Sequence, residues 1–204
     1  MDLYGILGSR TRRCLWALEE TGLPFEYHHI EFRKGDQRTP EYLAMNPNGK
    51  VPVLKDGDFC LFESAAICNY VGEKVPEKGL VPASGTRERG LYDQWMFFVI
   101  GELEQPLWNI GKHKFALPEK WRREEMFEVA AHEWTTAAGV LASQLGSRDT
   151  ILPGKFTMAD VMIAQTLSWA RRFKFPLGHD NLERYADAQL ARPAYERTEK
   201  YPAK

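Results

Sequence analysis

The sequence VPVLKDGDFCLFES, residues 51–64, predicts a β-hairpin followed directly by a helix. Two apolar runs, at residues 51–55 and 59–62, flank Asp56-Gly57, and Asp-Gly between such runs is typical of a tight hairpin turn. Ser64 is a favourable N-cap residue, and the helical pattern that begins there extends to residue 73. The hairpin and helix together indicate the end of a small α/β unit.

The residues before this hairpin alternate between strand-like and helix-like segments. Residues 3–6 and 25–32 are apolar enough to form strands, and residues 12–21 follow a helical pattern that Gly22 ends. The polar segment 33–40 has no clear periodicity. The order strand, helix, strand, loop, hairpin, helix predicts a mixed sheet with helices packed on it.

The chain after residue 85 is helical in pattern. A linker over residues 75–85 holds two prolines and two glycines. Helices are expected over residues 86–109, where Pro106 should kink or end the helix, and then over 119–145, 158–173, 181–190 and from Pro193. We therefore predict an α/β plus all-α protein, with a first domain at residues 1–76 and an all-helical domain at residues 86–204.

Composition restricts the classes of function. The 204 residues carry a formal net charge of -1, so no basic excess favours nucleic acid or an anionic membrane as a partner. No apolar run is long enough to span a membrane, and the N-terminus lacks the pattern of a secretory signal. The three cysteines form no C-x-x-C pair and do not cluster with the five histidines, which predicts a cytoplasmic protein with neither a disulfide framework nor a metal site.

Three places in the first domain could carry chemistry, and each also has a structural explanation. Ser9, at a strand-to-helix turn, can donate a hydrogen bond to a thiolate near the positive end of the helix, or simply cap that helix. Ser64 begins a helix whose N–H groups attract a carboxylate, and Glu63 beside it can pair with an ammonium group, although Ser64 is also an ordinary N-cap. Pro52 suits the start of a strand with either a cis or a trans bond before it.

Four segments together resemble the cytosolic glutathione transferase family. They are LYGILGSRTRR at residues 3–13, NPNGKVPVL at 46–54, ESAAI at 63–67 and FTMAD at 156–160. In the last segment, Thr157 and Asp160 have nearly the spacing of a capping box, so its role is expected to be structural. The resemblance covers essentially the whole chain and points to a serine-type, bacterial-like member. It implies the glutathione transferase fold, which has a thioredoxin-like N-terminal domain and a C-terminal helical-bundle domain.

The resemblance implies a detoxification enzyme that conjugates the thiolate of glutathione, its co-substrate, to a hydrophobic electrophile without a metal. Ser9 matches the serine that donates to the glutathione sulfur. The main chain of Val51, before a cis-Pro52, would pair with the cysteinyl part as an added strand does. Glu63 and Ser64 match the pair that holds the γ-glutamyl end. The full set of implied glutathione-binding residues is Gln37, Arg38, Lys50, Val51, Pro52, Glu63 and Ser64.

The first turn of the first helix departs from the family pattern. Many serine-type members have proline or cysteine, then arginine, shortly after the serine, whereas Arg10 and Thr11 follow Ser9 here. Thr11 is therefore a second candidate for the catalytic hydrogen-bond donor. Tyr4 is a third, because other classes use a tyrosine near this end. Cys14 lies one turn into the helix, and we expect it in or near the core.

The second, hydrophobic substrate is expected between the two domains, where pockets commonly form. Its candidate lining residues are Phe98, Leu103, Trp108, Phe115 and Trp169, although core packing or a dimer face would explain any one of them. Apolar residues on two faces of the helix over residues 86–109 indicate more burial than a monomer needs. Because the family is usually homodimeric, a two-fold homodimer is expected.

Two other functions stay open on the same fold. One is a non-catalytic glutathione-binding or interaction module, since a fold does not fix a function. The other is a glutathione-dependent peroxidase, which also needs only the thiolate. A cysteine-type reductase is disfavoured, because positions 9 and 10 hold Ser9 and Arg10.

Overall fold

The computed structural model describes residues 1–202, which form two compact units. The first unit contains residues 1–81 together with the C-terminal segment from residue 191, and the second contains residues 82–190. The expected helical domain extends to residue 204, whereas the structure groups the last segment with the first unit. No helix within residues 1–202 combines the length and apolar character needed to cross a bilayer.

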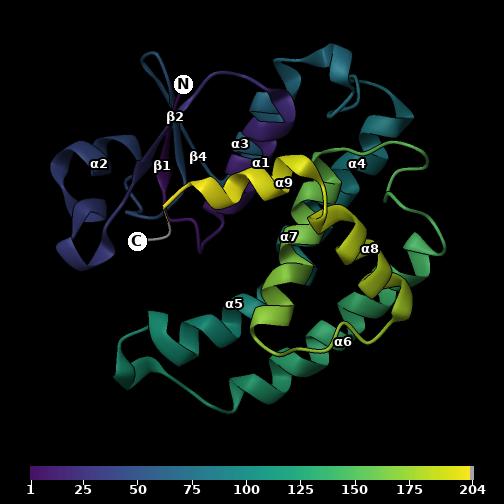
Figure 1. The fold of residues 1–204 in the computed structure, drawn as a ribbon. Coiled ribbons are helices and arrows are strands. Elements are labelled where there is room, and N and C mark those ends of the chain that lie inside the picture. The colour runs from purple at the N-terminus through teal and green to yellow at the C-terminus, as the bar shows by residue number, and fades with distance from the viewer. Residues whose placement is uncertain (203–204) are drawn as a thin grey trace. The chain divides into compact units, whose positions relative to one another are not determined.

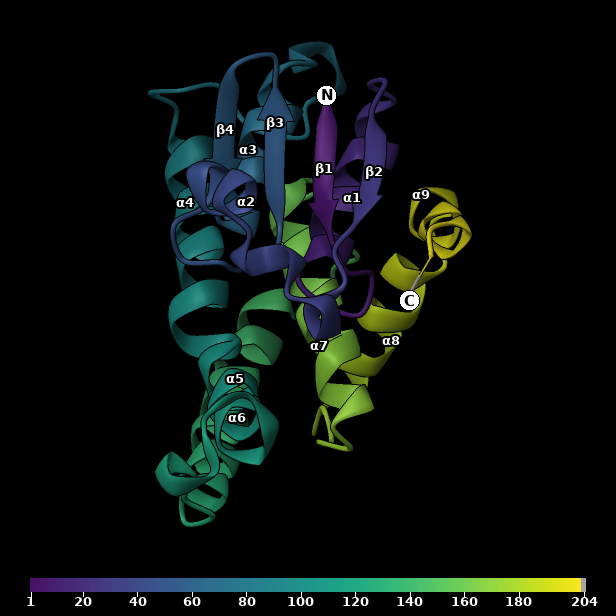
Figure 2. The ribbon, with the colours of Figure 1, turned by 90° about the vertical axis from the view of Figure 1, so that its left-hand side faces the viewer.

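The first unit is built on a four-stranded mixed sheet, which confirms the predicted fold class. Its strands are β1 (Asp2–Gly5), β2 (Glu26–His29), β3 (Val53–Asp56) and β4 (Phe59–Phe62), in the order β2-β1-β3-β4 (Figure 2). β1 runs parallel to β2 and antiparallel to β3, and β3 pairs antiparallel with β4. Gly57 makes the β3–β4 turn with φ 65°, a conformation that glycine adopts without strain.

Helices cover both faces of this sheet. α1 (Thr11–Thr21) and α3 (Ser64–Glu73) pack against each other on one face, where Leu3 and Leu54 are buried. α2 (Pro40–Met45) lies on the opposite face, in front of the strands in Figure 2. There Tyr42 of α2 joins a buried cluster with Ile30, which follows β2, and with Val53 of β3. Successive side chains along a strand point to opposite faces, so the same strands contribute apolar residues to the core on each face of the sheet.

Helix α2 lies beside the segment in which the sequence shows no periodicity. Two short 3-10 turns, Phe32–Lys34 and Asp36–Arg38, lead into it. Thr39 accepts a hydrogen bond from Tyr42 N at 3.3 Å, and Pro40 occupies the first turn, where its missing N–H costs nothing. Threonine followed by proline is therefore the local start signal, and a helix of six residues is too short to display a period.

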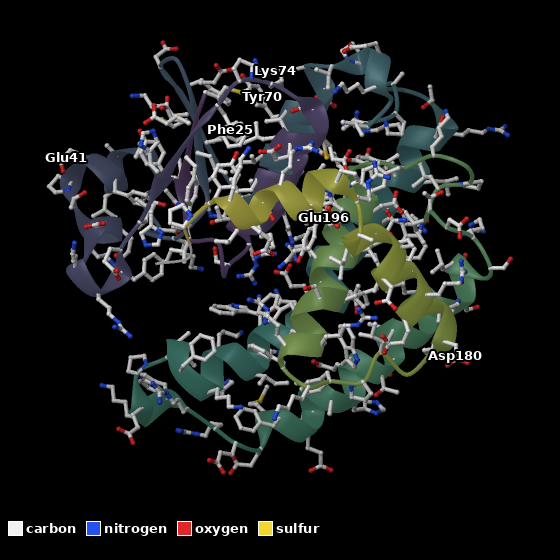
Figure 3. All side chains as sticks on the ribbon, in the orientation of Figure 1. Phe25, Glu41, Tyr70, Lys74, Asp180 and Glu196 are labelled. Atoms are coloured by element: carbon white, nitrogen blue, oxygen red, sulfur yellow. The ribbon has the colours of Figure 1, made fainter. Side chains whose placement is uncertain are left out.

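The β3–β4 hairpin is tied to α3 at its turn. Tyr70 Oη donates to Asp56 Oδ2 at 2.8 Å, and Lys74 Nζ lies 2.7 Å from the same oxygen. Figure 3 shows Tyr70 and Lys74 side by side, and the ammonium lies 4.6 Å from the centre of the tyrosine ring. These contacts hold the hairpin on the helix that follows it in sequence.

The C-terminal segment, with α9 (Pro193–Glu196), lies along α1 (Figure 1). Arg192 donates two hydrogen bonds to the Glu20 carboxylate, at 2.7 and 3.0 Å, and Trp16 Nε1 donates a third at 3.0 Å. Tyr195 packs edge-on against Trp16, with 4.9 Å between the ring centroids. These contacts explain why the segment belongs to the first unit, although sequence order places it after the helical domain.

Glu20→Ala is expected to lower the free energy of unfolding by about 2 kcal/mol, because Arg192 and the Trp16 indole lose one shared acceptor. The Glu20 side chain is only 11% exposed, so water does not replace it freely. Urea unfolding measures the change. Asp149→Ala is the control, since Asp149 pairs with Arg184 but is 83% exposed, and its loss should cost less than about 0.5 kcal/mol. Equal losses in both variants would contradict this account of the segment.

The second unit is all-helical, as predicted. Its helices are α4 (Arg87–Phe98), α5 (Gln105–Gly111), α6 (Met126–Leu145), α7 (Met158–Arg172) and α8 (Asp180–Leu190). α5 packs on α6, and α8 packs on α7. Nearly every side chain of α7 is buried, so this helix forms the centre of the unit.

The single helix expected over residues 86–109 is divided in the structure. α4 ends at Phe98, a π-helical segment follows at Val99–Leu103, and α5 begins at Gln105. Pro106 occupies the first turn of α5, where no hydrogen bond from its nitrogen is needed. The proline therefore begins a new helix rather than kinking the old one.

The predicted capping box at the start of α7 is confirmed. Asp160 accepts a hydrogen bond from Thr157 N at 2.9 Å, and the Thr157 side chain completes the box. Asp160 also accepts from Ile151 N and from Tyr185 Oη, each at 2.8 Å. Burial raises the pKa of this carboxyl, and the hydrogen bonds oppose that effect. One buried carboxylate therefore joins α7, α8 and the loop before them.

Candidate functional site

One end of the sheet brings the candidate residues of the first unit together. β1 and β4 both run antiparallel to β3, so the ends of β1 and β4 lie beside the start of β3. We call this end, with the turns attached to it, the sheet-end site. The candidate residues in these turns are Ser9, Val51, Pro52, Glu63 and Ser64.

Ser9 lies in the turn between β1 and α1, where hydrogen bonds join it to Ile6 and Thr11. Its Oγ donates to Ile6 O at 2.6 Å and accepts from Thr11 N at 3.2 Å. The same oxygen lies 2.9 Å from Thr11 Oγ1, which accepts from Ile6 N at 3.2 Å. Ser9 is partly exposed, whereas Thr11 has no exposed surface. Of the two hydroxyl groups, only that of Ser9 belongs to a residue that solvent reaches.

The other two residues considered near this turn lie elsewhere. Tyr4 packs on the α2 face of the sheet, and its ring stacks on that of His28 with 4.6 Å between the centroids. Burial, followed by the negative charge of Asp2, raises the Tyr4 pKa, so its phenol stays neutral near pH 7. Cys14 is fully buried, and burial raises the pKa of its thiol well above the usual value. It lies in the core, as its position in the sequence suggests.

The turn from β4 to α3 has an unusual backbone conformation. Glu63 adopts φ 73° and ψ 111°, a region that residues other than glycine rarely enter. Its side chain is exposed and does not cap α3. An exposed carboxylate thus stands beside an uncapped helix N-terminus, an arrangement suited to the ammonium and carboxylate groups of an amino acid.

Ser64 connects this turn to α1. It is buried, with its Oγ 3.4 Å from Arg13 Nη1 and its carbonyl oxygen 3.8 Å from Cys14 Sγ. The first turns of α1 and α3 therefore lie side by side. The structure thereby brings Ser9 and Glu63, which are far apart in sequence, to neighbouring turns of one site.

The start of β3 completes the sheet-end site. The Val51–Pro52 bond is cis, and the Lys50 carbonyl before it accepts hydrogen bonds from Tyr42 Oη at 2.7 Å and Asn46 Nδ2 at 2.8 Å. Among residues 1–202, the main chain of Val51 bonds to no other backbone group. An extended peptide can therefore pair with it. The sequence gives a signal for Asn46, through the NPNGK motif, and none for Tyr42.

Gln37 and Arg38 contact the segment that leads to Lys50. A Cβ atom on Gly49, where φ is 58°, would come within 2.8 Å of Arg38 Nη1 and 2.9 Å of Gln37 O. Only glycine permits this close approach. Within the described residues, Gln37 Oε1 is buried without a hydrogen-bond partner. The structure thus places these two residues next to Gly49, which precedes Lys50.

The five residues expected to line a hydrophobic site all lie in the second unit. Phe98 ends α4, Trp108 lies half-buried on α5, and Phe115, 60% exposed, follows α5, whereas Leu103 and Trp169 are buried. Phe98 lines a hollow of about 470 Å³ between residues 98–109 and α6. Polar side chains of Glu102, Asn109, His132 and Glu133 also line it.

A group of possible metal ligands occurs at the opposite end of β1. Carboxylate oxygens of Asp2 and Glu26 and an imidazole nitrogen of His28 lie within 4.8 Å of one another. Asp2 Oδ1 and His28 Nε2 already pair at 2.9 Å across the β1–β2 ladder. We therefore assign the group to strand pairing.

Comparison with known sequences places these residues in a wider context. Residues 1–73 match the family described as glutathione S-transferase, N-terminal domain. Glutathione S-transferase F10 of Arabidopsis thaliana is 42% identical over 97 residues, which are 47% of this chain and 45% of that protein. The matched part thus spans about half the length of that relative. Glutathione S-transferase D7 of Drosophila melanogaster is 29% identical over 201 residues, 96% of this chain and 87% of that protein.

Comparison with solved structures agrees with the topology. The glutathione transferase URE2P6 from Phanerochaete chrysosporium, solved in complex with oxidized glutathione, matches with a TM-score of 0.84 and 28% identity. The match covers 98% of this chain and 94% of that chain. The chain therefore has the fold that the resemblance implies: a thioredoxin-like domain with a helical domain.

Proposed function

Since these matches support placing the chain in the glutathione S-transferase family, we propose that it conjugates glutathione to a hydrophobic electrophile. The observation that carries the proposal is the composition of the sheet-end site. Three features lie at the same end of one sheet: the exposed Glu63 beside a helix start without a side-chain cap, the Ser9 hydroxyl, and the main chain of Val51, which bonds to no other backbone group within residues 1–202. These groups match the chemistry of an amino-acid head group, a peptide backbone and a thiolate.

Glutathione would bind with its γ-glutamyl end at α3 and its glycine end toward the loop before α2. The Glu63 carboxylate would pair with the ammonium group, and the N–H groups at Ser64 would hold the α-carboxylate. The main chain of Val51 would form a short antiparallel pair with the cysteinyl residue. The cis bond before Pro52 belongs to the same strand start. The side chains of Gln37, Arg38 and Lys50 would contact the carboxylate of the glycine residue.

The thiolate of glutathione would be stabilised by hydrogen bonding from Ser9. A free thiol has a pKa of about 8.5, and a hydrogen-bond donor near a helix N-terminus favours the anion. With an aryl halide, the sulfur would form a carbon–sulfur bond, the halide would leave with its bonding electron pair, and the thiol proton would have passed to solvent beforehand. Ser9 would form no covalent bond, so this is the serine-type assignment within the family.

The second substrate would bind to the helical unit. Phe98 and Trp108 are half-buried and Phe115 is exposed, so each has surface that a bound molecule could contact. Leu103 and Trp169 are buried and would support that surface from beneath. The wider range of reactions on this scaffold includes hydroperoxide reduction, which uses the same thiolate.

Glu63→Ala and Glu63→Gln are expected to weaken glutathione binding about tenfold, because the ammonium group loses a charged partner. The glutamine variant separates charge from shape at this strained backbone position. Isothermal titration calorimetry measures the affinity. Glu77→Ala, at an exposed acidic residue in the 3-10 turn Pro76–Lys78, is the control and should leave affinity unchanged. Unchanged affinity in both Glu63 variants would remove this residue from the site.

We further propose that the protein forms a homodimer through α4 and α6. These helices expose large apolar side chains, of which Phe97 is the most exposed at 76%, together with Leu91, Val129 and Val140. Light scattering should give about twice the 23.5 kDa chain mass. A monomer mass at micromolar concentration would contradict the proposal. A cytoplasmic location and a bacterial-like class stay predictions, and the two named curated relatives come from a plant and an insect.

A further inference from the structure

We propose that Thr11 is a positioning residue, which orients the Ser9 hydroxyl and strengthens it as a hydrogen-bond donor. The inference deepens the proposed function and rests on it for the identity of the group that Ser9 meets. It assigns separate roles to two neighbouring hydroxyl groups that sequence alone leaves as rival donors. The observations that carry it are the direction of each hydrogen bond and the burial of Thr11.

The direction of each hydrogen bond follows from the groups involved. Ile6 O can only accept, so Ser9 Oγ is the donor in their 2.6 Å contact. This contact uses the single hydroxyl proton of Ser9. In the 2.9 Å pair with Ser9 Oγ, Thr11 Oγ1 must therefore donate. Thr11 Oγ1 in turn accepts from Ile6 N at 3.2 Å, so its own position is fixed.

The surroundings of Thr11 prevent it from meeting a substrate directly. Its side chain has no exposed surface. A Cβ atom on Gly5 would lie 2.2 Å from Thr11 Oγ1, so the threonine side chain occupies space that only glycine leaves open. Any effect of Thr11 on a bound thiolate must therefore pass through Ser9.

The hydrogen-bond set allows Ser9 to change partner without losing its orientation. When a thiolate arrives, the Ser9 proton turns from Ile6 O toward the sulfur, and no covalent bond is made or broken. Thr11 N and Thr11 Oγ1 continue to donate to Ser9 Oγ. Because an oxygen that accepts hydrogen bonds becomes a stronger donor through its own proton, Thr11 raises the ability of Ser9 to stabilise the anion.

The first test measures the pKa of the glutathione thiol bound to the full-length protein, by ultraviolet difference absorbance against pH. Thr11→Val removes the hydroxyl and keeps the shape, and it should raise the thiol pKa by about one unit. Thr11→Ser keeps the hydroxyl and should restore a pKa close to that of the wild type. In the Ser9→Ala background, Thr11→Val should cause no further rise, because its effect requires Ser9.

The second test needs no glutathione. Ser9→Cys places a titratable group at this position, and the thiol pKa of the variant is measured by its alkylation rate against pH, with the wild-type protein as the blank for the native cysteines. Adding Thr11→Val to Ser9→Cys should raise that pKa by about one unit, whereas adding Thr11→Ser should not. Failure of the wild type to bind glutathione would contradict the proposed function but not the role of Thr11. The second test would still measure that role.

Three outcomes would overturn the role of Thr11. One is an unchanged thiol pKa when Thr11→Val is introduced in both tests. Another is an equal rise with and without Ser9, which would show that Thr11 acts through general structure. The third is a rise with Thr11→Ser as large as that with Thr11→Val, which would exclude the hydroxyl as the cause. Thermal unfolding of each variant confirms that folded proteins are compared.

Discussion

Ser9→Ala is expected to lower kcat/KM for conjugation of an aryl halide on the order of 10²-fold at neutral pH, because one donor to the developing anion is lost. Glutathione affinity should stay within a few-fold of the wild-type value, since Ser9 contacts only the sulfur in this account. A coupled readout is the pKa of the bound thiol, which should rise. Loss of the donor disfavours the charged form of the thiol.

The same loss of the donor should change how the conjugation rate depends on pH. In the wild type, the rate should increase as the pH rises through the thiol pKa, because the thiolate is the nucleophile. In Ser9→Ala that increase should occur at higher pH, so the two rates should approach each other in alkaline solution. Ser143→Ala, at an exposed position on α6, is the control. Activity near the wild-type level in Ser9→Ala would contradict the assignment of Ser9 as the donor to the sulfur.

Asp160→Ala is expected to lower the free energy of unfolding by about 3–5 kcal/mol, which is among the largest effects of a single substitution. The variant would leave Ile151 N, Thr157 N and Tyr185 Oη without their acceptor inside the second unit. Chemical denaturation measures the loss. Asp180→Ala is the control, because Asp180 also lies in the first turn of a helix but is exposed (Figure 3). Its loss should cost about 0.5 kcal/mol.

Asp160 also predicts a pH dependence of stability. Because burial raises its folded pKa above the unfolded value of about 3.9, the folded state holds the proton more tightly. The contribution of this group is complete below the unfolded pKa and is lost as the pH rises through the folded pKa. Asp160→Asn cannot titrate at this position, so its stability should lack this pH-dependent contribution. A wild-type stability profile that matches the asparagine variant throughout this acidic window would contradict the assignment.

The parts of the fold that sequence predicted well have strong local signals. Asp56-Gly57 specifies a tight turn, because the left-handed conformation there suits glycine, and the apolar runs on either side give the strands. The helix predicted to begin at Ser64 is α3, although Ser64 is its first helical residue and the N-cap position, where Ser64 was expected, is Glu63. The capping pair Thr157 and Asp160 likewise fixed the start of α7.

The parts that sequence did not predict depend on contacts between distant segments. The C-terminal segment joins the first unit because Arg192 and Tyr195 meet Glu20 and Trp16 on α1, about 175 residues away. No periodicity within the segment could indicate that partner. The division of the helix over residues 86–109 has a similar cause, since Pro106 allows either a kink or a new start.

The candidate site also has residues that sequence could identify and distinctions that only the folded chain reveals. Sequence pointed to Ser9, Val51 and Glu63 through turn chemistry and through the resemblance of whole motifs. It could not rank Ser9 above Thr11, because both hydroxyl groups suit the first turn of a helix. Burial separates the two, and burial is a property of the folded chain.

Calorimetric titration of the wild-type protein with reduced glutathione tests most directly whether the turns at the end of the sheet receive this tripeptide. We predict saturable uptake of one glutathione per chain, with an affinity that falls when Glu63 is replaced. Absence of any saturable heat at millimolar glutathione, from a protein shown to be folded, would contradict it.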